Sequence, residues 1–428
     1  MLKFVYFILN DRIMTRSLSI LTLIVLTCMA FSACKKDSDS KGGKDAPEKL
    51  VLASYGETTY TLVSSSSLYA DAKAFAASFD AVTGATLNMG TTTPYQRDDE
   101  IIVGTGKDCE EAVKSIKHGY VIKTSGTRVI IAGTDDTWTV LALEAFYKQV
   151  INATKYKVDG GIEIPSGLRI SQSTNDPQMI AMLLSTGHPF TISAEMVGSC
   201  VGSGNCNVAQ GAASDGKHVY FVLRDSSDEN GMIFKYTLDP FRFVANSEAY
   251  KCYHANDMTF DSVNNRVIAI HASGDTGGIT AFDANTLTPT EIRTSLGIGG
   301  ITYNLKRNVY GITQGGTKYQ IADANFKKTA DYGRSDNMTS KYTAQGMGSD
   351  DSYVYFPMSP SSGKSTDNVL VTYNWSGNYV GEIHIDTSLE SESMFYAAGE
   401  YYVNFYAGGG RGAHLYRIRP VISFTYAD

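Results

Sequence analysis

The chain has 428 residues, of which 43% are apolar and 19% charged. This balance fits a folded protein with an apolar core and length for more than one domain. The net charge of −7, with no stripe of basic residues, argues against nucleic acid as a partner. No nucleotide-binding motif is present, and we expect no cofactor.

The N-terminal segment is typical of a secretory signal peptide. Arg16 is followed by an apolar run from Leu18 to Phe31, and small residues precede Cys34. The run is too short, and wrongly flanked, for a membrane span. We therefore expect residues 1–33 to be a signal peptide.

The stretch "FSAC", which ends at Cys34, resembles the lipobox of bacterial lipoproteins. The resemblance implies that Cys34 carries lipid and begins the mature chain, with ordinary secretory cleavage as the alternative. Residues 34–47 are polar and charged, so we expect a flexible tether. The Lys, Asp and Ser that follow the cysteine resemble surface-export signals of Bacteroidetes lipoproteins. The implied location is the bacterial cell envelope, at the outer membrane or cell surface, with lipid as the only membrane anchor.

Four cysteines remain after Cys34: Cys109, Cys200, Cys206 and Cys252. An envelope location permits disulfides. Cys200 and Cys206 bracket a loop short enough to close, so they are the disulfide candidates, and Cys206–Cys252 is the alternative pairing. The spacing fits no zinc motif. The acidic loop 225–230 lacks the spacing of a calcium-binding EF-hand, so we favour a solvated hairpin loop and expect no metal site.

Residues 48–172 have the pattern of an α/β sandwich. Apolar residues from Leu68 to Phe79 recur at helical spacing, and Gly84 ends that helix. Residues 100–103 indicate a buried strand, 118–133 a hairpin around a Ser-Gly turn, and 137–151 an amphipathic helix. Helices that alternate with strands in this way cover a small sheet.

Part of this segment, "DEIIVGTGKD…GYVIKTSGTRVIIAGTDDTWTVLALEAFY", resembles a known accessory domain. That domain precedes the catalytic barrels of several glycoside hydrolases, among relatives of α-glucuronidases and β-hexosaminidases. The resemblance implies a non-catalytic domain and an association with glycans. Nothing resembling the catalytic barrel follows, so it implies no particular reaction.

The rest of the chain contains a repeat. Similar segments begin at Ala209, Ala255, Ile298, Ala344 and Ser391, which are 43 to 47 residues apart. Each begins with a short apolar strand, a turn near Asp or Asn, and a Tyr/Val-rich strand, and two further strands follow in most copies. A period of ~40–50 residues with four strands per unit is typical of β-propeller blades.

We therefore expect an α+β N-terminal domain followed by an all-β propeller of five blades over residues 207–428. Residues 173–206 would be a linker that supplies a ring-closing strand, and 188–197 is the expected donor to the last blade. A β-sandwich with chance internal similarity is the alternative.

Polar residues recur at two positions of the repeat. One is the turn after the first strand, occupied by Asp215, Asp261, Asn304 and Asp350, with Ala397 as the exception. The other is the start of the first strand, where the propeller geometry predicts one polar mouth of a central channel. The candidate ligand-binding residues at this mouth are Gln210, Tyr253, His254, Asn256, Asp257, Gln345, Glu390 and Glu392.

Amides, carboxylates and an imidazole around a concavity suit hydrogen bonding to a glycan, with Tyr253 as a stacking platform. The alternative for each residue is a structural role, in which it pairs with the backbone of a neighbouring blade.

Three functions remain open. The first is an envelope lipoprotein that binds glycans or helps to process them. The second is a polysaccharide hydrolase or lyase that uses Asp257 and Glu392 as an acid/base pair, or His254 as the base. The third is a protein–protein interaction scaffold. Among these three, we favour a protein that is not an enzyme.

The stretch "AQGMGSDDSYVY", from Ala344, is similar to strands of the five-bladed glutaminyl cyclotransferases. Gly346, Met347 and Gly348 stand where those enzymes place an acidic residue. The similarity therefore implies the propeller architecture alone.

Overall fold

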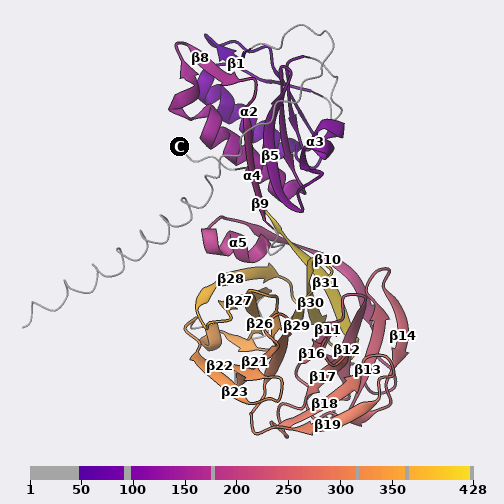
Figure 1. The fold of residues 1–428 in the computed structure, drawn as a ribbon. Coiled ribbons are helices and arrows are strands. Elements are labelled where there is room, and N and C mark those ends of the chain that lie inside the picture. The colour runs from indigo at the N-terminus through magenta and orange to yellow at the C-terminus, as the bar shows by residue number, and fades with distance from the viewer. Residues whose placement is uncertain are drawn as a thin grey trace, which may run out of the picture. The chain divides into compact units, whose positions relative to one another are not determined.

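The computed structural model describes residues 48–90, 98–174, 179–314, 318–336, 338–361 and 366–424. The predicted signal peptide and tether, with Cys34, lie outside these ranges. The described residues form seven separate sheets, two near the N-terminus and five antiparallel ones in the rest of the chain (Figure 1). None of the helices in these ranges has the length and hydrophobicity of a membrane span.

A six-stranded mixed sheet is the centre of the N-terminal part. Its neighbouring strands β2, β4 and β6 run parallel, and β5 is antiparallel to β6 and to β9. The predicted strand at 100–103 and the hairpin at 118–133 are both confirmed. The strand order is β3 (Asn88–Met89), β2 (Thr61–Ser64), β4 (Glu100–Val103), β6 (Arg128–Gly133), β5 (His118–Ser125) and β9 (Arg169–Thr174).

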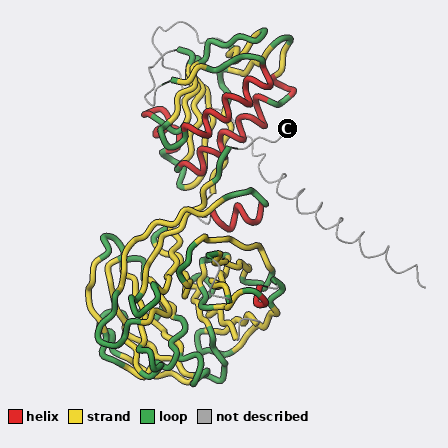
Figure 2. The backbone as a smooth tube through the Cα atoms, turned by 180° about the vertical axis from the view of Figure 1, so that it is seen from behind, coloured by secondary structure: helices red, strands yellow, loops and turns green. Residues whose placement is uncertain are grey.

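Helices cover both faces of this sheet because successive side chains of a strand point to opposite sides. In β4, Ile101 and Val103 pack with α2 (Tyr69–Thr83) and α4 (Asp136–Phe146), whereas Ile102 packs with α3 (Gly106–Val113). Figure 2 shows these helices in red. The predicted C-terminal end of the first helix is confirmed. Helix α2 stops before Gly84, which has φ +68° and whose N–H donates to the carbonyl oxygen of Asp80. The last turn of the predicted 137–151 helix is a π-helix, Tyr147–Ile151.

A small second sheet and the end of the chain complete this core. The sheet has the order β1 (Lys49–Ser54), β8 (Gly161–Pro165) and β7 (Lys157–Val158). The Phe424 ring lies 5.8 Å from that of Phe75 in α2 and 6.2 Å from that of Tyr147. No local pattern in the sequence predicts these two contacts of Phe424.

Five antiparallel sheets, which we number I to V, follow in chain order. Sheet I is β11 (Val208–Ser214), β12 (His218–Arg224), β13 (Asn230–Thr237) and β14 (Arg242–Asn246), with β15 (Tyr250–Lys251) beside β13. Sheet II is β16 (Met258–Asp261), β17 (Arg266–Ile270), β18 (Gly278–Asp283) and β19 (Pro289–Arg293). Sheet III is β20 (Gly300–Asn304), β21 (Val309–Gln314), β22 (Lys318–Asp323) and β23 (Lys328–Gly333).

The last two sheets differ slightly from this pattern. Sheet IV is β26 (Tyr353–Pro360), β27 (Asp367–Asn374) and β28 (Tyr379–Asp386), and its first strand is split into β24 (Tyr342–Ala344) and β25 (Gly348–Ser349). Sheet V is β29 (Glu390–Ala397), β30 (Glu400–Tyr406), β31 (Ala413–Val421) and β10 (Thr191–Cys200).

Strand β10 comes from the segment that precedes sheet I. It pairs with β31 from Thr191 opposite Val421 to Cys200 opposite Ala413. The expected donation of 188–197 to the last sheet is therefore seen, with a slightly later register. The same segment also contains a helix that we did not predict, α5 (Met179–Thr186), which buries Ile180 and Leu183.

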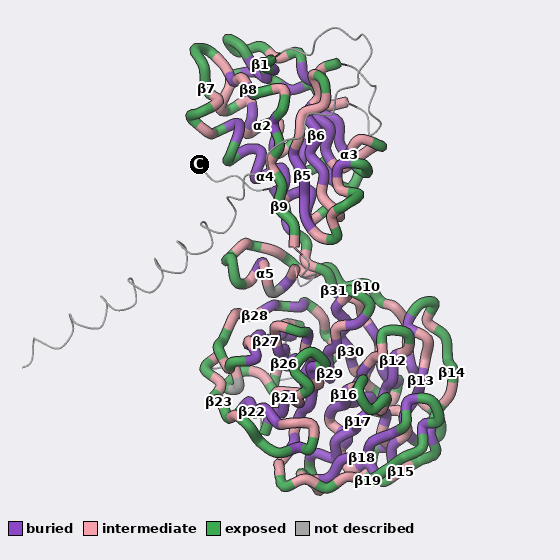
Figure 3. The backbone as a smooth tube through the Cα atoms, viewed as in Figure 1, coloured by how far each residue is buried: buried purple, intermediate pink, exposed green. Residues whose placement is uncertain are grey.

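The first strands of the five sheets contact one another in turn. Strand β11 contacts β16, β16 contacts β20, β20 contacts β25, β25 contacts β29, and β29 contacts β11. Figure 3 shows buried residues along two of these strands, β16 and β29. Equivalent positions of the repeats are therefore neighbours in space, although they are far apart in sequence.

Neither predicted disulfide is formed. Cys200, Cys206 and Cys252 are separate buried thiols. The Cys206 thiol donates to the carbonyl oxygen of Asn230, 3.7 Å away, and the Cys252 thiol to that of Tyr253, 3.1 Å away. The loop before Cys206 closes through backbone hydrogen bonds with Ser203 instead of a disulfide. Burial raises the pKa of Cys252 to about 12.

Candidate binding site at the start of the first strands

Each first strand has two ends, and polar residues gather at both. We call the end with Gln210, Asn256, Gly299, Gln345 and Glu392 the start end. We call the other end, where the turn to the second strand follows, the turn end. The sequence predicted a ligand site at the start end.

Three predicted residues meet at the start end. The side-chain nitrogen of Asn256 donates to the carbonyl oxygens of Gly299, at 2.7 Å, and Gln345, at 2.6 Å. The side-chain nitrogen of Gln345 donates in turn to Glu390, at 2.6 Å. Sheets II, III, IV and V are thus joined by one chain of hydrogen bonds.

Asp257 lies beneath this chain and is completely buried. Its Oδ2 accepts hydrogen bonds from the backbone N–H of Ile301, at 2.8 Å, and of Met347, at 2.7 Å. A side chain at Gly346 would place its Cβ 2.7 Å from Asp257 Oδ1, so only glycine permits this approach. Burial raises the pKa of Asp257 well above its usual range. These contacts tie sheet II to sheets III and IV, which is the structural alternative considered for this residue.

Gln210 and Glu392 are also buried, with 4% and 3% of their surface exposed. Gln210 donates to the carbonyl oxygen of Ala209 at 2.7 Å and accepts at its own carbonyl from Asn404 at 2.8 Å. The pKa of Glu392 is raised well above its usual range, first by burial and then by the nearby charge of Glu390. Both residues belong to the layer below the surface of the start end.

His254 and Tyr253 have different environments. The His254 Nδ1 atom lies 3.2 Å from Asp228, which also pairs with Arg224. The Tyr253 ring lies 5.1 Å from the His271 ring and beneath the ammonium of Lys251. His254 lines a cavity at the start end, whereas Tyr253 does not line either of the two cavities described next.

Two adjoining cavities open at the start end, with volumes of about 500 and 530 Å³. Both are lined by Thr343, Gln345 and Ser361. The first also contacts His254, Asn256 and Tyr342, and the second contacts Glu390, Tyr406 and Arg411. The sequence analysis missed Tyr342 and Tyr406, which supply the aromatic surface that we expected from Tyr253. Their signal was weak because tyrosines occur throughout the repeat.

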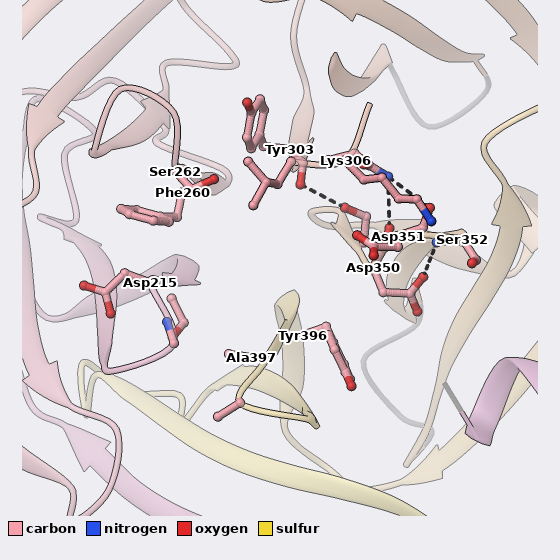
Figure 4. Close-up of a pocket in the computed structure, with 16 residues that line it drawn as sticks. Asp215, Phe260, Ser262, Tyr303, Lys306, Asp350, Asp351, Ser352, Tyr396 and Ala397 are labelled. Atoms are coloured by element: carbon pink, nitrogen blue, oxygen red, sulfur yellow. Dashed lines mark hydrogen bonds between the residues drawn. The ribbon is translucent and has the colours of Figure 1, made fainter. Parts of the chain in front are cut away.

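A third cavity, of about 560 Å³, lies at the turn end and is lined by turns from all five sheets (Figure 4). Two of the acidic residues there, Asp215 and Asp350, are hydrogen-bonded within the protein. Asp350 accepts from the backbone N–H of Ser352 and Tyr353 and from the hydroxyls of Tyr355 and Tyr401. Burial nevertheless raises its pKa to about 6.

The same arrangement recurs in other sheets. Asp215 accepts from the Tyr220 hydroxyl at 2.8 Å and from the N–H groups of its own turn. Asp261 accepts from Tyr310 of the next sheet at 2.7 Å and from Arg266 at 2.9 Å. Where the repeated turn residue is aspartate, it thus holds the turn and a tyrosine hydroxyl in place.

The acidic loop 225–230 also closes on itself. The Asp225 carboxylate accepts from the backbone N–H of Ser227, Glu229 and Asn230 at 3.1 to 3.2 Å. This bonding is that of a capped turn. Within the described ranges, no group of three or more His, Cys, Asp or Glu side chains is placed to hold a metal ion.

Comparison with known proteins adds no family assignment. No family model matches the chain, and neither does any curated protein. Among solved structures, hydrazine synthase from Kuenenia stuttgartiensis has a TM-score of 0.31 at 11% identity, and the match covers 48% of this chain and 57% of that one. A nidogen/laminin complex has a TM-score of 0.31 at 13% identity, covering 51% and 86%. A luciferin-regenerating enzyme has a TM-score of 0.34 at 10% identity, covering 54% and 95%.

Proposed function

We propose that sheets I to V are the blades of a closed five-bladed β-propeller, and that the chain is an envelope lipoprotein that binds glycans at the start end. Three facts support the architecture: the repeat period, the successive contacts of the first strands, and the completion of sheet V by β10. One four-stranded sheet cannot bury both faces alone, so blades stack around an axis.

The envelope location rests on the N-terminal sequence. The apolar run before Cys34 and the polar stretch after it resemble a lipoprotein signal and its tether. The association with glycans rests on the resemblance of the first domain to an accessory domain of glycoside hydrolases. Replacement of Cys34 by Ala is expected to abolish labelling by an alkynyl fatty acid and to release the protein from the membrane fraction.

The observation that carries the binding proposal is the cluster of Asn256, Gln345 and Glu390. Three different sheets bring these polar side chains together at two adjoining cavities, beside Tyr342 and Tyr406. Ligand pockets of ~300–1,000 Å³ with a few convergent polar groups and aromatic rings suit sugars, which need both hydrogen bonds and stacking surfaces.

We propose binding rather than catalysis because the carboxylates of the suggested acid/base pair are not at the cavity surface. Asp257 and Glu392 are both buried and line neither start-end cavity. Product release from a bound polysaccharide would instead support the hydrolase or lyase.

The test is titration calorimetry against a panel of oligosaccharides, with Gln345→Ala as the variant. The backbone carbonyl that accepts from Asn256 remains in this variant, so the strand contact is kept. We expect at least a tenfold loss of affinity, which is about 1.4 kcal/mol. Lys306→Ala, in the turn-end cavity, is the matched control and is expected to bind normally. Failure of every glycan to bind, together with capture of a protein partner, would favour the scaffold.

A further inference from the structure

The amide side chains of the start end use most of their hydrogen-bond donors within the protein. The side-chain nitrogens of Asn256 and Gln345 donate to two backbone carbonyls and to Glu390, respectively. Only an –NH₂ group can donate to the two carbonyl oxygens beside Asn256, so the orientation of that amide is fixed by its surroundings. Below them, the side-chain nitrogen of Gln210 donates to the backbone of its neighbour.

The acceptors of these same residues are not used in this way. Among the described residues, Gln210 Oε1 is buried without a hydrogen-bond partner. The amide oxygens of Asn256 and Gln345 receive no hydrogen bond from the described protein, and both side chains line the cavities. A neutral amide offers both donors and acceptors. Because Asn256 uses both of its N–H bonds and Gln345 uses one, these two amides present mainly acceptors to the cavities, beside hydroxyls such as that of Thr343.

The charged side chains at the cavities include one carboxylate, that of Glu390, for which the described residues supply no ion pair. The Arg411 guanidinium donates to two carbonyl oxygens of its own loop, and Arg224 pairs with Asp228. Glu390 lines the same cavity as Arg411, and burial raises the pKa of the nearby Glu392, which disfavours the charged form of Glu392. The carboxylate partner of Arg224 offsets its charge, whereas Arg411 keeps its charge in the cavity that Glu390 lines. The carboxylate of Glu390 favours a cationic ligand.

We infer that the start end selects glycans with free amino groups over neutral glycans, and neutral glycans over anionic ones. This inference rests on the proposed glycan binding and names its substrate class. An ammonium group carries three donors and a positive charge and has no acceptor, so it complements the open oxygens of Asn256, Gln345 and Glu390. A uronate or sulfate would meet the same acceptors and the carboxylate of Glu390, with the guanidinium of Arg411 in the same cavity.

The experiment compares oligosaccharides of one backbone, with and without N-acetylation, and an anionic oligosaccharide of a different backbone. Glucosamine oligomers, their N-acetylated counterparts and galacturonate oligomers are titrated at pH 5.5, where the amine carries its proton. We expect the glucosamine oligomer to bind at least tenfold more tightly than the N-acetylated one, and galacturonate to bind weakest. Glu390→Gln is expected to weaken glucosamine binding about tenfold and to change N-acetylated binding by less than twofold.

Asp351→Asn, at the turn-end cavity, is the control for overall charge. An equal loss of glucosamine binding in this variant would overturn the inference, because the preference would not belong to the start end. Equal or tighter binding of the N-acetylated or galacturonate oligomers would overturn the inference but leave the proposed glycan binding standing. Absence of binding to all three, and to the wider panel, would overturn the proposed function itself.

Discussion

The two ends of the first strands use polar residues in opposite ways. At the turn end, the same residue type recurs from sheet to sheet, as in Asp215, Asp261 and Asp350, and its carboxylate is bonded to tyrosine hydroxyls and turn N–H groups. At the start end, the equivalent positions differ, as in Asn256 and Glu392, and acceptors remain open. Recurrence in a repeat marks what every copy needs to fold, whereas variation marks where the copies combine into one site.

Asp257 is the residue that tests this comparison most severely, because it varies between repeats and yet acts structurally. Replacement by Ala would leave the N–H groups of Ile301 and Met347 buried without their acceptor. Each such group costs about 1–3 kcal/mol, so we expect the free energy of unfolding to fall by about 4 kcal/mol. Urea denaturation followed by circular dichroism measures this loss.

Asp257→Asn is the matched control for that measurement. The amide keeps one oxygen for the two N–H groups, so its loss is expected to be less than half that of the Ala variant. A loss below about 1 kcal/mol for Asp257→Ala would contradict the structural role.

Asp350, at the turn end, is expected to make the free energy of unfolding depend on pH. Burial raises its pKa from 3.8 to about 6, so between these values the folded protein binds a proton that the unfolded chain has released. Stability then falls as the pH rises through this window. At 1.36 kcal/mol per pKa unit, the change is about 3 kcal/mol.

Denaturation of the wild type and of Asp350→Asn at pH 4, 5, 6 and 7 isolates this contribution, because other groups titrate alike in both proteins. We expect the stability of the wild type relative to the variant to decrease from pH 4 to pH 7. An increase over that range would show that the four donors to Asp350 outweigh its burial and lower its pKa instead.

Two tyrosines of sheet III allow a buried hydrogen bond at the turn end to be compared with an exposed one. The Tyr310 hydroxyl donates to Asp261 in the core, and the Tyr303 hydroxyl donates to Asn308 at the surface. We expect Tyr310→Phe to lower the free energy of unfolding by about 2 kcal/mol, because the bond is to a buried charged group. Tyr303→Phe should change the free energy of unfolding by less than about 0.5 kcal/mol. Similar losses in both variants would contradict a structural role for the hydrogen bonds of the turn end.

Local patterns in the sequence were enough to predict much of the fold. The helix that ends at Gly84, the strand at 100–103 and the donation of 188–197 to the last sheet all follow from periodicity, turn residues or repeat counting. Helix α5 was missed because its short apolar run lies between a linker and a strand. The contact of Phe424 with Phe75 joins the two ends of the described chain and leaves no local signal.

The candidate site was predictable only in part, for a related physical reason. Repeat alignment placed Asn256 near Gln345, because equivalent positions of neighbouring sheets meet. It did not separate surface residues from buried ones, so Glu392 and Tyr253 were given roles at the cavity that their surroundings do not support. Whether a side chain is buried or at the cavity surface depends on which face of the strand it occupies and on the turns of the backbone. Both depend on the three-dimensional packing.

The smallest expected effect is on the stability of Gln345→Ala, and it bears directly on the comparison of the two ends. The side chain contacts exposed Glu390, and hydrogen bonds of this kind contribute little to folding. We expect the free energy of unfolding to change by less than about 0.5 kcal/mol, while oligosaccharide affinity falls at least tenfold. A stability loss as large as that of Tyr310→Phe would place Gln345 among the residues that hold the sheets together, and the start end would then resemble the turn end.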